Sequence, residues 1–569
     1  MSHSHTRFLV LRAGSLLATF VLASMVPADD AKPSPDGSPN RPAANAAKRT
    51  PGPEVTIDAG KVRGLIVGTN KDVLAYKGIP YAKPPVGDLR WREPQPPEKW
   101  QDVRDCFTFG NVCAQRSDPF INSIAQLKLN APMNEDCLYL NVWSPAKSAT
   151  AKLPVLFWIH GGGYTTGAGS QTLYDGDALV HHGVVLVTIN YRLGPLGFLA
   201  HPALTKESSN HASGNYGLLD QIEALRWVKR NITAFGGDPE RVTIFGESAG
   251  GGSVICLLSS SLARGLFHAA IAQSPGGLEL PRLQQSTSER TSGERLGAAL
   301  ISKCGLPPET DTSAMRKLDA NLLIKNATGY APATGPNDRL GATAAYLGPV
   351  VDGYVIPDTP SVLFTAGKEN PVPLIIGHTR DEETLFLQRA AAPKTVADYE
   401  KKIQDTFGAE AATISANYPV SADKDILSAC VRLLTDMKWA APVRNAARLH
   451  STKGYPTYRY VFSRGSKLPF LATLGAHHGC ELAYVFGVQT PEDPEAKRVI
   501  DLVQGYWVNF ADKGDPNGNG LPKWPKFTTD SDAVLEIEND AVVRAHYREK
   551  YLDAMDKYHH SMDTSTKPK

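Results

Sequence analysis

The chain of 569 residues lacks a strong charge of either sign and lacks long apolar stretches outside its N-terminus. Its 60 Lys and Arg residues nearly balance 58 Asp and Glu residues, which argues against a nucleic acid or an anionic surface as partner. No later apolar run approaches the roughly 20 residues that span a bilayer. Cys-x-x-Cys pairs, His/Cys clusters at zinc spacing and internal repeats are also missing. We therefore expect no structural metal and no cofactor.

The N-terminal segment is predicted to be a secretory signal. Residues 1–28 contain Arg7 and Arg12 but no acidic residue, and the apolar run from Leu16 to Val26 is too short to span a bilayer. Val26-Pro27-Ala28 offers small residues at the cleavage positions. A membrane anchor is the alternative. Cleavage would leave a secreted or periplasmic protein of net charge 0, because both excess positive charges of the +2 chain lie in this segment.

The remaining chain is predicted to form one domain between two polar segments. Residues 29–53 are mostly Pro, Ala, Asn, Ser, Asp and Lys, without a large apolar side chain, and are expected to be a disordered linker. No linker divides residues 54–560. Residues 561–569 form a polar tail with no heptad or cysteine that would tether a partner chain, so the sequence makes no prediction of an oligomer.

Apolar runs and helical periodicity alternate along the middle of the chain. Near-continuous apolar runs at Leu153 to Ile159, Val184 to Ile189 and Val242 to Phe245 predict buried strands. Apolar residues at helical spacing from Leu218 to Ile232 predict a helix between the last two. This alternation indicates a parallel sheet with right-handed crossovers. Further strands are expected at Ala269 to Ala272, Pro373 to Ile376 and Tyr458 to Phe462, a hairpin at Val55 to Val67, and a late helix at Ile500 to Phe510.

The most informative motif, Gly246-Glu247-Ser248-Ala249-Gly250, follows the third of these strands. Gly-x-Ser-x-Gly between a strand and a helix is the nucleophile elbow of an α/β-hydrolase, in which a strained turn presents the serine. An ordinary glycine-rich turn is the alternative. We predict Ser248 as nucleophile in an α/β-hydrolase fold, with a large, mostly parallel central sheet flanked by helices. Residues 282–345 and 388–450 are expected to be helical insertions that roof the site.

A second glycine-rich motif, His160-Gly161-Gly162-Gly163-Tyr164, directly follows the strand at Leu153 to Ile159. Consecutive glycines let backbone N–H groups approach a substrate carbonyl closely. Gly162 and Gly163 are the expected oxyanion donors, and the N–H of Ala249 is the expected third. The alternative, a phosphate-binding turn, lacks the Lys-Ser/Thr pair of a P-loop.

The expected order after the serine in this fold is an acid and then a histidine. Three successive carboxylates, Asp381 to Glu383, follow the strand at Pro373 to Ile376, and spacing alone leaves the choice among them open. His477 or His478 is the expected base. A His-His metal site is the alternative, but adjacent histidines point apart on a helix or strand.

Seven cysteines in an exported chain predict at least one disulfide. A bridge between Cys113 and Cys137 would close a compact polar loop and is our first choice, with Cys106–Cys113 as the alternative. Cys256 follows the elbow within a helical stretch and is expected to be a small buried apolar residue.

Together the motifs resemble the type-B carboxylesterase family, which includes cholinesterases and many bacterial esterases. The resemblance covers nearly all of residues 55–530. Besides the motifs above, it is carried by Gly78-Ile79-Pro80-Tyr81-Ala82, Pro84-Pro85, Glu135-Asp136-Cys137-Leu138-Tyr139-Leu140-Asn141-Val142, Gly214-Asn215-Tyr216-Gly217-Leu218-Leu219-Asp220-Gln221, Phe235-Gly236-Gly237-Asp238-Pro239, Pro349-Val350-Val351-Asp352-Gly353, Tyr506-Trp507 and Gly514-Asp515-Pro516.

The resemblance implies a role for residues that spacing left open. The acid of the family's triad is the glutamate of an Asp-Glu-Gly stretch, which implies that Glu382 is the acid here. Glu383 stands in this chain where the family has the glycine. The family histidine precedes Gly-x-Glu, which implies His478. Cys113 and Cys137 match the family's loop disulfide.

The resemblance thus implies a secreted serine carboxylesterase that acts through Ser248, His478 and Glu382 and an acyl-enzyme intermediate. We expect it to bind a small-molecule ester. We expect no nucleic acid partner and, once the signal has been cleaved, no membrane. The loop between Cys113 and Cys137 has no Trp or Tyr for cation–π binding, which argues against a choline ester. Two alternatives stay open: an amidase or peptidase with the same triad, and a non-catalytic binding protein on the same fold.

Overall fold

The structure is a computed structural model of the chain. It describes residues 50–565 apart from 69, 117–126, 288–289, 329–338, 341–346, 388–391, 466, 468–470, 489–492, 494 and 519. The expected signal at 1–28 and most of the expected linker at 29–53 lie outside the described residues. Strand β1 (Thr50–Ile57) begins inside the expected linker, and helix α17 (Glu549–Ser565) runs past residue 560.

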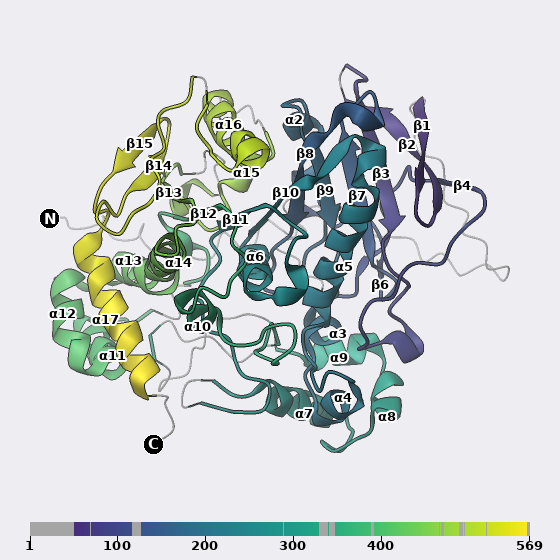
Figure 1. The fold of residues 1–569 in the computed structure, drawn as a ribbon. Helices are drawn as coiled ribbons and strands as arrows, with labels where there is room; N and C mark the ends of the chain where they lie inside the picture. The colour runs from purple at the N-terminus through teal and green to yellow at the C-terminus, as the bar shows by residue number, and fades with distance from the viewer. Residues whose placement is uncertain are drawn as a thin grey trace, which may run out of the picture. The chain divides into compact units, whose positions relative to one another are not determined.

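A sheet of thirteen strands runs through the described part of the chain (Figure 1). Its order is β1-β2-β3-β7-β9-β8-β10-β11-β12-β13-β14-β15, and β4 pairs with β2. The strands from β9 to β14 in this order are parallel to one another. The other pairs along this path are antiparallel, whereas β4 pairs with β2 in parallel. Besides β1, the strands are β2 (Gly60–Val67), β3 (Val73–Pro80), β4 (Val103–Asp105), β7 (Tyr139–Ser144), β8 (Leu153–Ile159), β9 (Val185–Ile189), β10 (Gly237–Glu247), β11 (Ala269–Gln273), β12 (Leu374–Thr379), β13 (Thr457–Phe462), β14 (Val534–Ile537) and β15 (Ala541–Arg544); β5 (Val112–Cys113) and β6 (Met133–Asn134) form a separate pair.

The helices cover both faces of this sheet (Figure 1). They are α2 (Asp177–Val180), α3 (Gly194–Phe198), α4 (Pro202–Glu207), α5 (Tyr216–Asn231), α6 (Ala249–Ser259), α7 (Gly293–Lys303), α8 (Thr312–Arg316), α9 (Ala320–Asn326), α10 (Pro360–Thr365), α11 (Val396–Phe407), α12 (Ala411–Asn417), α13 (Ile426–Thr435), α14 (Ala441–Ser451), α15 (Leu482–Val485), α16 (Ala496–Lys513) and α17. No helix in the part of the chain that the structure describes combines the length and apolarity needed to cross a bilayer.

The continuous apolar runs arise because the central strands are buried on both faces. Along β8, Val155, Phe157 and Ile159 join the core that contains α5 and α6. Leu156 and Trp158, which alternate with them, join the opposite core that contains α16. Successive side chains of a strand point to opposite faces, so two apolar cores require an unbroken apolar run.

The expected elements are confirmed with small shifts at their ends. Strand β8 has the predicted bounds, whereas β10 extends from Gly237 to Glu247, well before the predicted start at Val242. The predicted hairpin is the antiparallel pair β1 and β2, and the two predicted helices are α5 and α16. These elements form the mixed sheet and helical layers of an α/β-hydrolase fold.

Candidate active site

Ser248 lies in the sharp turn between β10 and α6, with φ 58° and ψ −123°. Its N–H donates to the carbonyl oxygen of Gln273 on β11 at 3.0 Å, which fixes this strained conformation. Only glycine fits at the two positions that flank the Glu247-Ser248-Ala249 turn, because a side chain there would collide with neighbouring backbone. A Cβ on Gly246 would lie 2.6 Å from the backbone of Gly250, and one on Gly250 would collide with the carbonyl oxygen of Ile159. The predicted elbow geometry is thus present, with Ser248 partly exposed.

The glycine-rich loop after β8 lies against this turn. A Cβ on Gly161 would be 3.1 Å from the Cβ of Ser248. Gly162 and Gly163 have φ of 106° and 61°, which side chains rarely adopt. Neither donates its N–H to another described residue. The N–H of Ala249 opens α6, where the helix dipole favours negative charge. The structure therefore places the start of the glycine-rich loop and the N-terminus of α6 beside the serine.

His478 and Glu382 form a close hydrogen-bonded pair. The distance from His478 Nδ1 to Glu382 Oε2 is 2.5 Å. The other carboxylate oxygen, Oε1, accepts from Ser274 Oγ at 2.6 Å and from the N–H of Thr379 at 2.7 Å. Burial alone would raise the pKa of Glu382, but the imidazole and these hydrogen bonds outweigh it and lower that pKa. Glu382 is therefore held as a carboxylate.

The two neighbouring carboxylates contact other groups. Asp381 accepts from the N–H of Ala476 at 2.9 Å. Glu383 accepts from Trp439 Nε1 at 2.8 Å and pairs with Lys438 Nζ at 2.9 Å. The structure brings Glu382 to the imidazole and turns Asp381 and Glu383 elsewhere.

The alternative base, His477, has a different environment. Its Nδ1 lies 2.9 Å from the carbonyl oxygen of His478. Burial lowers the pKa of His477, so its imidazole is kept neutral. Only His478 of the two contacts a side-chain carboxylate among the described residues.

Two further carboxylates, which the sequence did not single out for the site, surround His478. Glu247 Oε1 lies 3.1 Å from His478 Nε2, and among the described residues no hydrogen bond joins that nitrogen to Ser248. Glu481 is buried and accepts from Gln273 Nε2 at 3.1 Å. Both are members of motifs, so a signal was available: Glu247 directly precedes Ser248 in Gly-x-Ser-x-Gly, and Glu481 ends the Gly-x-Glu stretch.

The closely spaced, buried carboxylates shift the pKa values of several groups in the site. Burial raises the pKa of Glu247 to about 7 and the pKa of Glu481 to about 8. Burial opposes a charged imidazole, but Glu247 and Glu382 outweigh it and raise the pKa of His478 to about 9. The site thus brings an imidazole of raised pKa, a serine in a strained turn and a glycine-rich loop together, which are groups that acyl transfer uses.

Nearly all of the described chain matches one known family. The model of the carboxylesterase family matches residues 51–555. The chain belongs to the carboxylesterase family. It is similar to fumonisin B1 esterase of Sphingopyxis macrogoltabida, with 39% identity over 82% of this chain and 83% of that protein. It is also similar to para-nitrobenzyl esterase of Bacillus subtilis (strain 168), with 35% identity over 85% of this chain and 96% of that protein.

Solved structures agree with the family match. A structure of PNB esterase superposes with a TM-score of 0.74 and 32% identity, covering 88% of this chain and 99% of that one. This carboxylesterase is therefore an α/β-hydrolase and a carboxylic ester hydrolase, and it acts on small ester substrates. The non-catalytic alternative is accordingly set aside.

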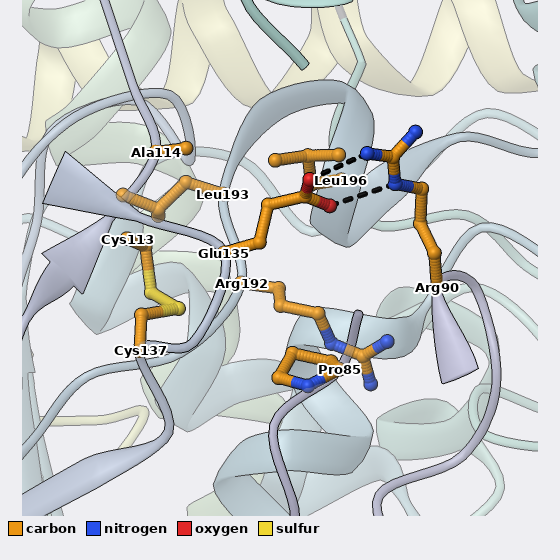
Figure 2. Close-up of a pocket in the computed structure, with 9 residues that line it drawn as sticks. All are labelled: Pro85, Arg90, Cys113, Ala114, Glu135, Cys137, Arg192, Leu193 and Leu196. Atoms are coloured by element: carbon orange, nitrogen blue, oxygen red, sulfur yellow. Dashed lines mark hydrogen bonds and ion pairs between the residues drawn. A yellow bond between two sulfur atoms is a disulfide. The ribbon is translucent and has the colours of Figure 1, made fainter. Parts of the chain in front are cut away.

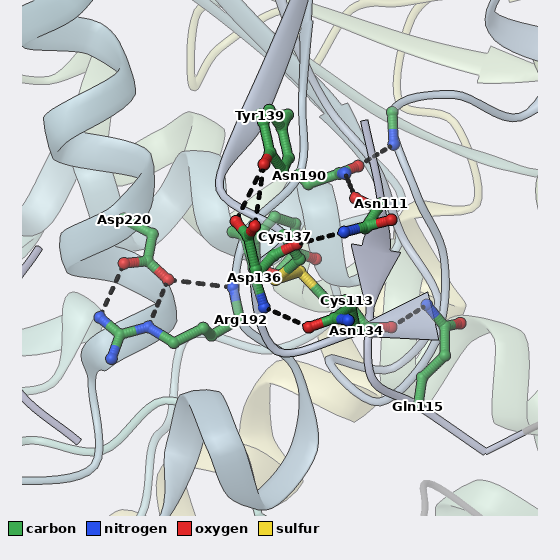
Figure 3. Close-up of a disulfide and its surroundings, with 12 residues drawn as sticks. Asn111, Cys113, Gln115, Asn134, Asp136, Cys137, Tyr139, Asn190, Arg192 and Asp220 are labelled. Carbon is green, nitrogen blue, oxygen red and sulfur yellow. Dashed lines mark hydrogen bonds and ion pairs between the residues drawn. A yellow bond between two sulfur atoms is a disulfide. The ribbon is translucent and has the colours of Figure 1, made fainter. Parts of the chain in front are cut away.

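The carboxylesterase has the predicted disulfide between Cys113 and Cys137, with Cα atoms 4.9 Å apart (Figure 3). Cys106 is a buried free thiol, so the alternative pairing is wrong. Gln115 Nε2 donates to the carbonyl oxygens of Cys113 and Gly167, both at 2.9 Å. Its Oε1 accepts the N–H of Gly167 at 2.8 Å. The disulfide loop is thereby tied to the segment just beyond the proposed oxyanion donors.

A small pocket lies beside this disulfide (Figure 2). The paired side chains of Arg90 and Glu135 form one wall, with Arg90 Nε donating to Glu135 Oε2 at 2.7 Å. Arg192 lines the pocket as well and is held by Asp220, at 2.7 Å between Nη2 and Oδ1. None of the proposed catalytic residues lines this pocket, and its charges are matched in pairs.

Proposed function

We propose that this carboxylesterase hydrolyses its ester through Ser248, His478 and Glu382 by way of an acyl-enzyme. The observation that carries the proposal is the 2.5 Å hydrogen bond from His478 Nδ1 to Glu382 beside a serine in the elbow conformation. This bond fixes the imidazole tautomer so that Nε2 is the basic nitrogen, and it stabilises the imidazolium that forms.

The proposed steps follow from the chemistry of the three groups. His478 Nε2 takes the Ser248 hydroxyl proton as Oγ bonds to the ester carbonyl carbon. The carbonyl π electrons move to oxygen, and the N–H groups of Gly162, Gly163 and Ala249 hold the oxyanion. Collapse expels the alcohol, which takes the proton from Nε2. Water then attacks the acyl-enzyme in the same manner and releases the acid.

The imidazole must first turn toward the serine, because its Nε2 faces Glu247 at 3.1 Å in the structure. Such hydrogen bonds are often long or misaligned without substrate and tighten in the Michaelis complex. Glu247 offers the imidazolium a second carboxylate, which supports proton transfer from the serine.

We further propose that the enzyme is exported. Residues 1–28 have the pattern of a signal peptide, and the Cys113–Cys137 disulfide favours an oxidising compartment. Residues 29–49 would then precede the catalytic domain, which begins with β1 at Thr50 and extends through α17 to Ser565.

The proposal is tested with p-nitrophenyl esters of increasing acyl length, using the wild type beside Ser248→Ala. We expect turnover by the wild type and a loss of about 10⁶-fold in kcat for the variant. The acyl length with the highest kcat/KM measures the size of the acyl pocket. A folded variant that retains wild-type turnover would overturn the assignment of Ser248.

A further inference from the structure

Glu383 joins the loop of the proposed acid to a distant helix. It is 2% exposed, and its N–H lies 3.4 Å from Thr435 Oγ1 at the end of α13. Its carboxylate accepts from Trp439 Nε1 at 2.8 Å and pairs with Lys438 Nζ at 2.9 Å. A buried carboxylate needs such partners because desolvation is otherwise costly. One contact therefore ties Glu383 to the last residue of α13, and two tie it to the helical turn that follows.

That turn is a π-helix, Asp436–Ala440, between α13 and α14. Single π-turns are rare and occur frequently at functional sites. Asp436, at its start, accepts from Tyr418 Oη at 2.7 Å and from Arg548 Nε at 2.9 Å. The π-helical turn is thus fixed at two places. Asp436 binds Tyr418 and Arg548, which directly precedes α17, and Trp439 and Lys438 bind Glu383 in the loop of the proposed acid.

Trp439 on this turn packs against the imidazole of His478. Their ring centroids are 4.7 Å apart, and Phe386 is 4.9 Å from the same imidazole. The Trp439 and Phe386 rings are nearly parallel, at 11°, with centroids 5.9 Å apart. Two aromatic rings therefore restrict the imidazole, and Glu383 holds one of them.

We propose that Glu383 is a positioning residue for His478. By accepting the indole N–H, it keeps Trp439 against the imidazole, so that Nδ1 stays on Glu382. Lys438 balances the charge of Glu383 but does not set the position of the indole. This inference rests on the proposed roles of His478 and Glu382. It also gives a role to the glutamate that replaces the family's glycine.

The kinetic test compares Glu383→Ala, Glu383→Gln and Lys438→Met on p-nitrophenyl acetate. Glu383→Ala should lower kcat on the order of 10- to 100-fold with KM within about twofold, because misplacement of a reacting group lowers the rate and not the binding. Glu383→Gln should restore most of kcat, because its amide oxygen still accepts the indole N–H. Lys438→Met should stay near the wild type. A loss in Lys438→Met equal to that in Glu383→Ala would overturn the proposal.

Proton NMR supplies a readout that does not depend on turnover. The proton between His478 Nδ1 and Glu382 should give a far-downfield resonance in the wild type and in Glu383→Gln, and it should broaden or vanish in Glu383→Ala. Asp501→Asn, at an exposed ion pair with Lys497 on α16, is the matched surface control and should leave the resonance unchanged.

An unchanged resonance and kcat in Glu383→Ala would refute the role of Glu383 while leaving the Ser248 test intact. If Glu383→Ala does not fold, Glu383→Leu takes its place, because leucine fills the site but cannot accept the indole N–H of Trp439. A wild-type kcat and an unchanged resonance in folded Glu383→Leu would also refute the role of Glu383.

Discussion

Two groups of buried charged side chains in this protein differ in how well their charges are matched. In the first, which we call the His478 group, the carboxylates of Glu247, Glu382 and Glu481 surround one imidazole. Three acids thus face a single base, and the pKa values of Glu247, Glu481 and His478 are all raised.

The second group, which we call the Asp532 group, is rich in arginine. Asp532 accepts from Arg444 Nε at 2.5 Å and from Arg459 Nη1 at 2.8 Å, and all three side chains are at most 1% exposed. Arg444 also donates to Asp553 at 2.7 Å. These contacts join α14, β13 and α17.

The difference teaches how one fold uses buried charge for two purposes. Charges that are paired across elements hold those elements together, and removing one partner leaves another buried and unpaired. Charges that are unmatched around an imidazole change its basicity, which would serve the proposed proton transfer from Ser248. Substitutions in the His478 group should therefore act on activity, and those in the Asp532 group on stability.

The largest expected effect is on turnover in His478→Ala. Loss of the proposed base should lower kcat by about 10⁶-fold, because a triad acts as a unit. His477→Ala is the matched control and should keep kcat within a few fold, since His477 contacts a backbone carbonyl. Steady-state kinetics of both variants measures this. Equal losses in the two would contradict the choice between them.

The next largest effect is on stability in Asp532→Ala. Removing the carboxylate leaves Arg444 and Arg459 buried without their shared partner, which should lower the free energy of unfolding by about 3–5 kcal/mol. Urea unfolding measures the loss, and kcat of the folded fraction should be unchanged. Asp501→Asn should cost at most about 1 kcal/mol, because its ion pair is exposed. An equal loss of unfolding free energy in Asp532→Ala and Asp501→Asn would contradict the stabilising role of the Asp532 group.

A smaller effect is expected on the pH dependence of Glu247→Gln. The charge of Glu247 raises the pKa of His478, so its removal should lower that pKa. The neutral imidazole, which is the basic form, would then be populated at lower pH. The acidic limb of the kcat/KM profile should move to lower pH, as a pH series on one p-nitrophenyl ester would show. A shift toward higher pH would contradict the assignment of Glu247.

Much of the fold could be predicted because its signals are local. The elbow combines a strand, a tight turn and a helix within about a dozen residues around Ser248, and the turn needs its glycines for space. The central strands were visible because two cores require unbroken apolar runs. The Cys113–Cys137 disulfide was also predicted, first as the pairing that would close a compact polar loop and then from the family resemblance.

The surroundings of His478 could not be predicted because distant segments build them. Trp439 reaches the imidazole from an expected insertion, and its contact depends on how α13 and α14 pack. Asp381, Glu382 and Glu383 follow one another in a short turn, where small dihedral differences decide the direction of each side chain. Spacing alone therefore could not choose among them.

The most direct test of the account is covalent labelling with diethyl p-nitrophenyl phosphate, followed by peptide mapping by mass spectrometry. The phosphorus is attacked by the serine that forms the acyl-enzyme, and p-nitrophenol leaves. The account predicts one diethylphosphoryl group on Ser248 in the wild type, none in Ser248→Ala, and slow labelling in His478→Ala. A label on another residue, with Ser248 unmodified and ester hydrolysis abolished, would contradict it.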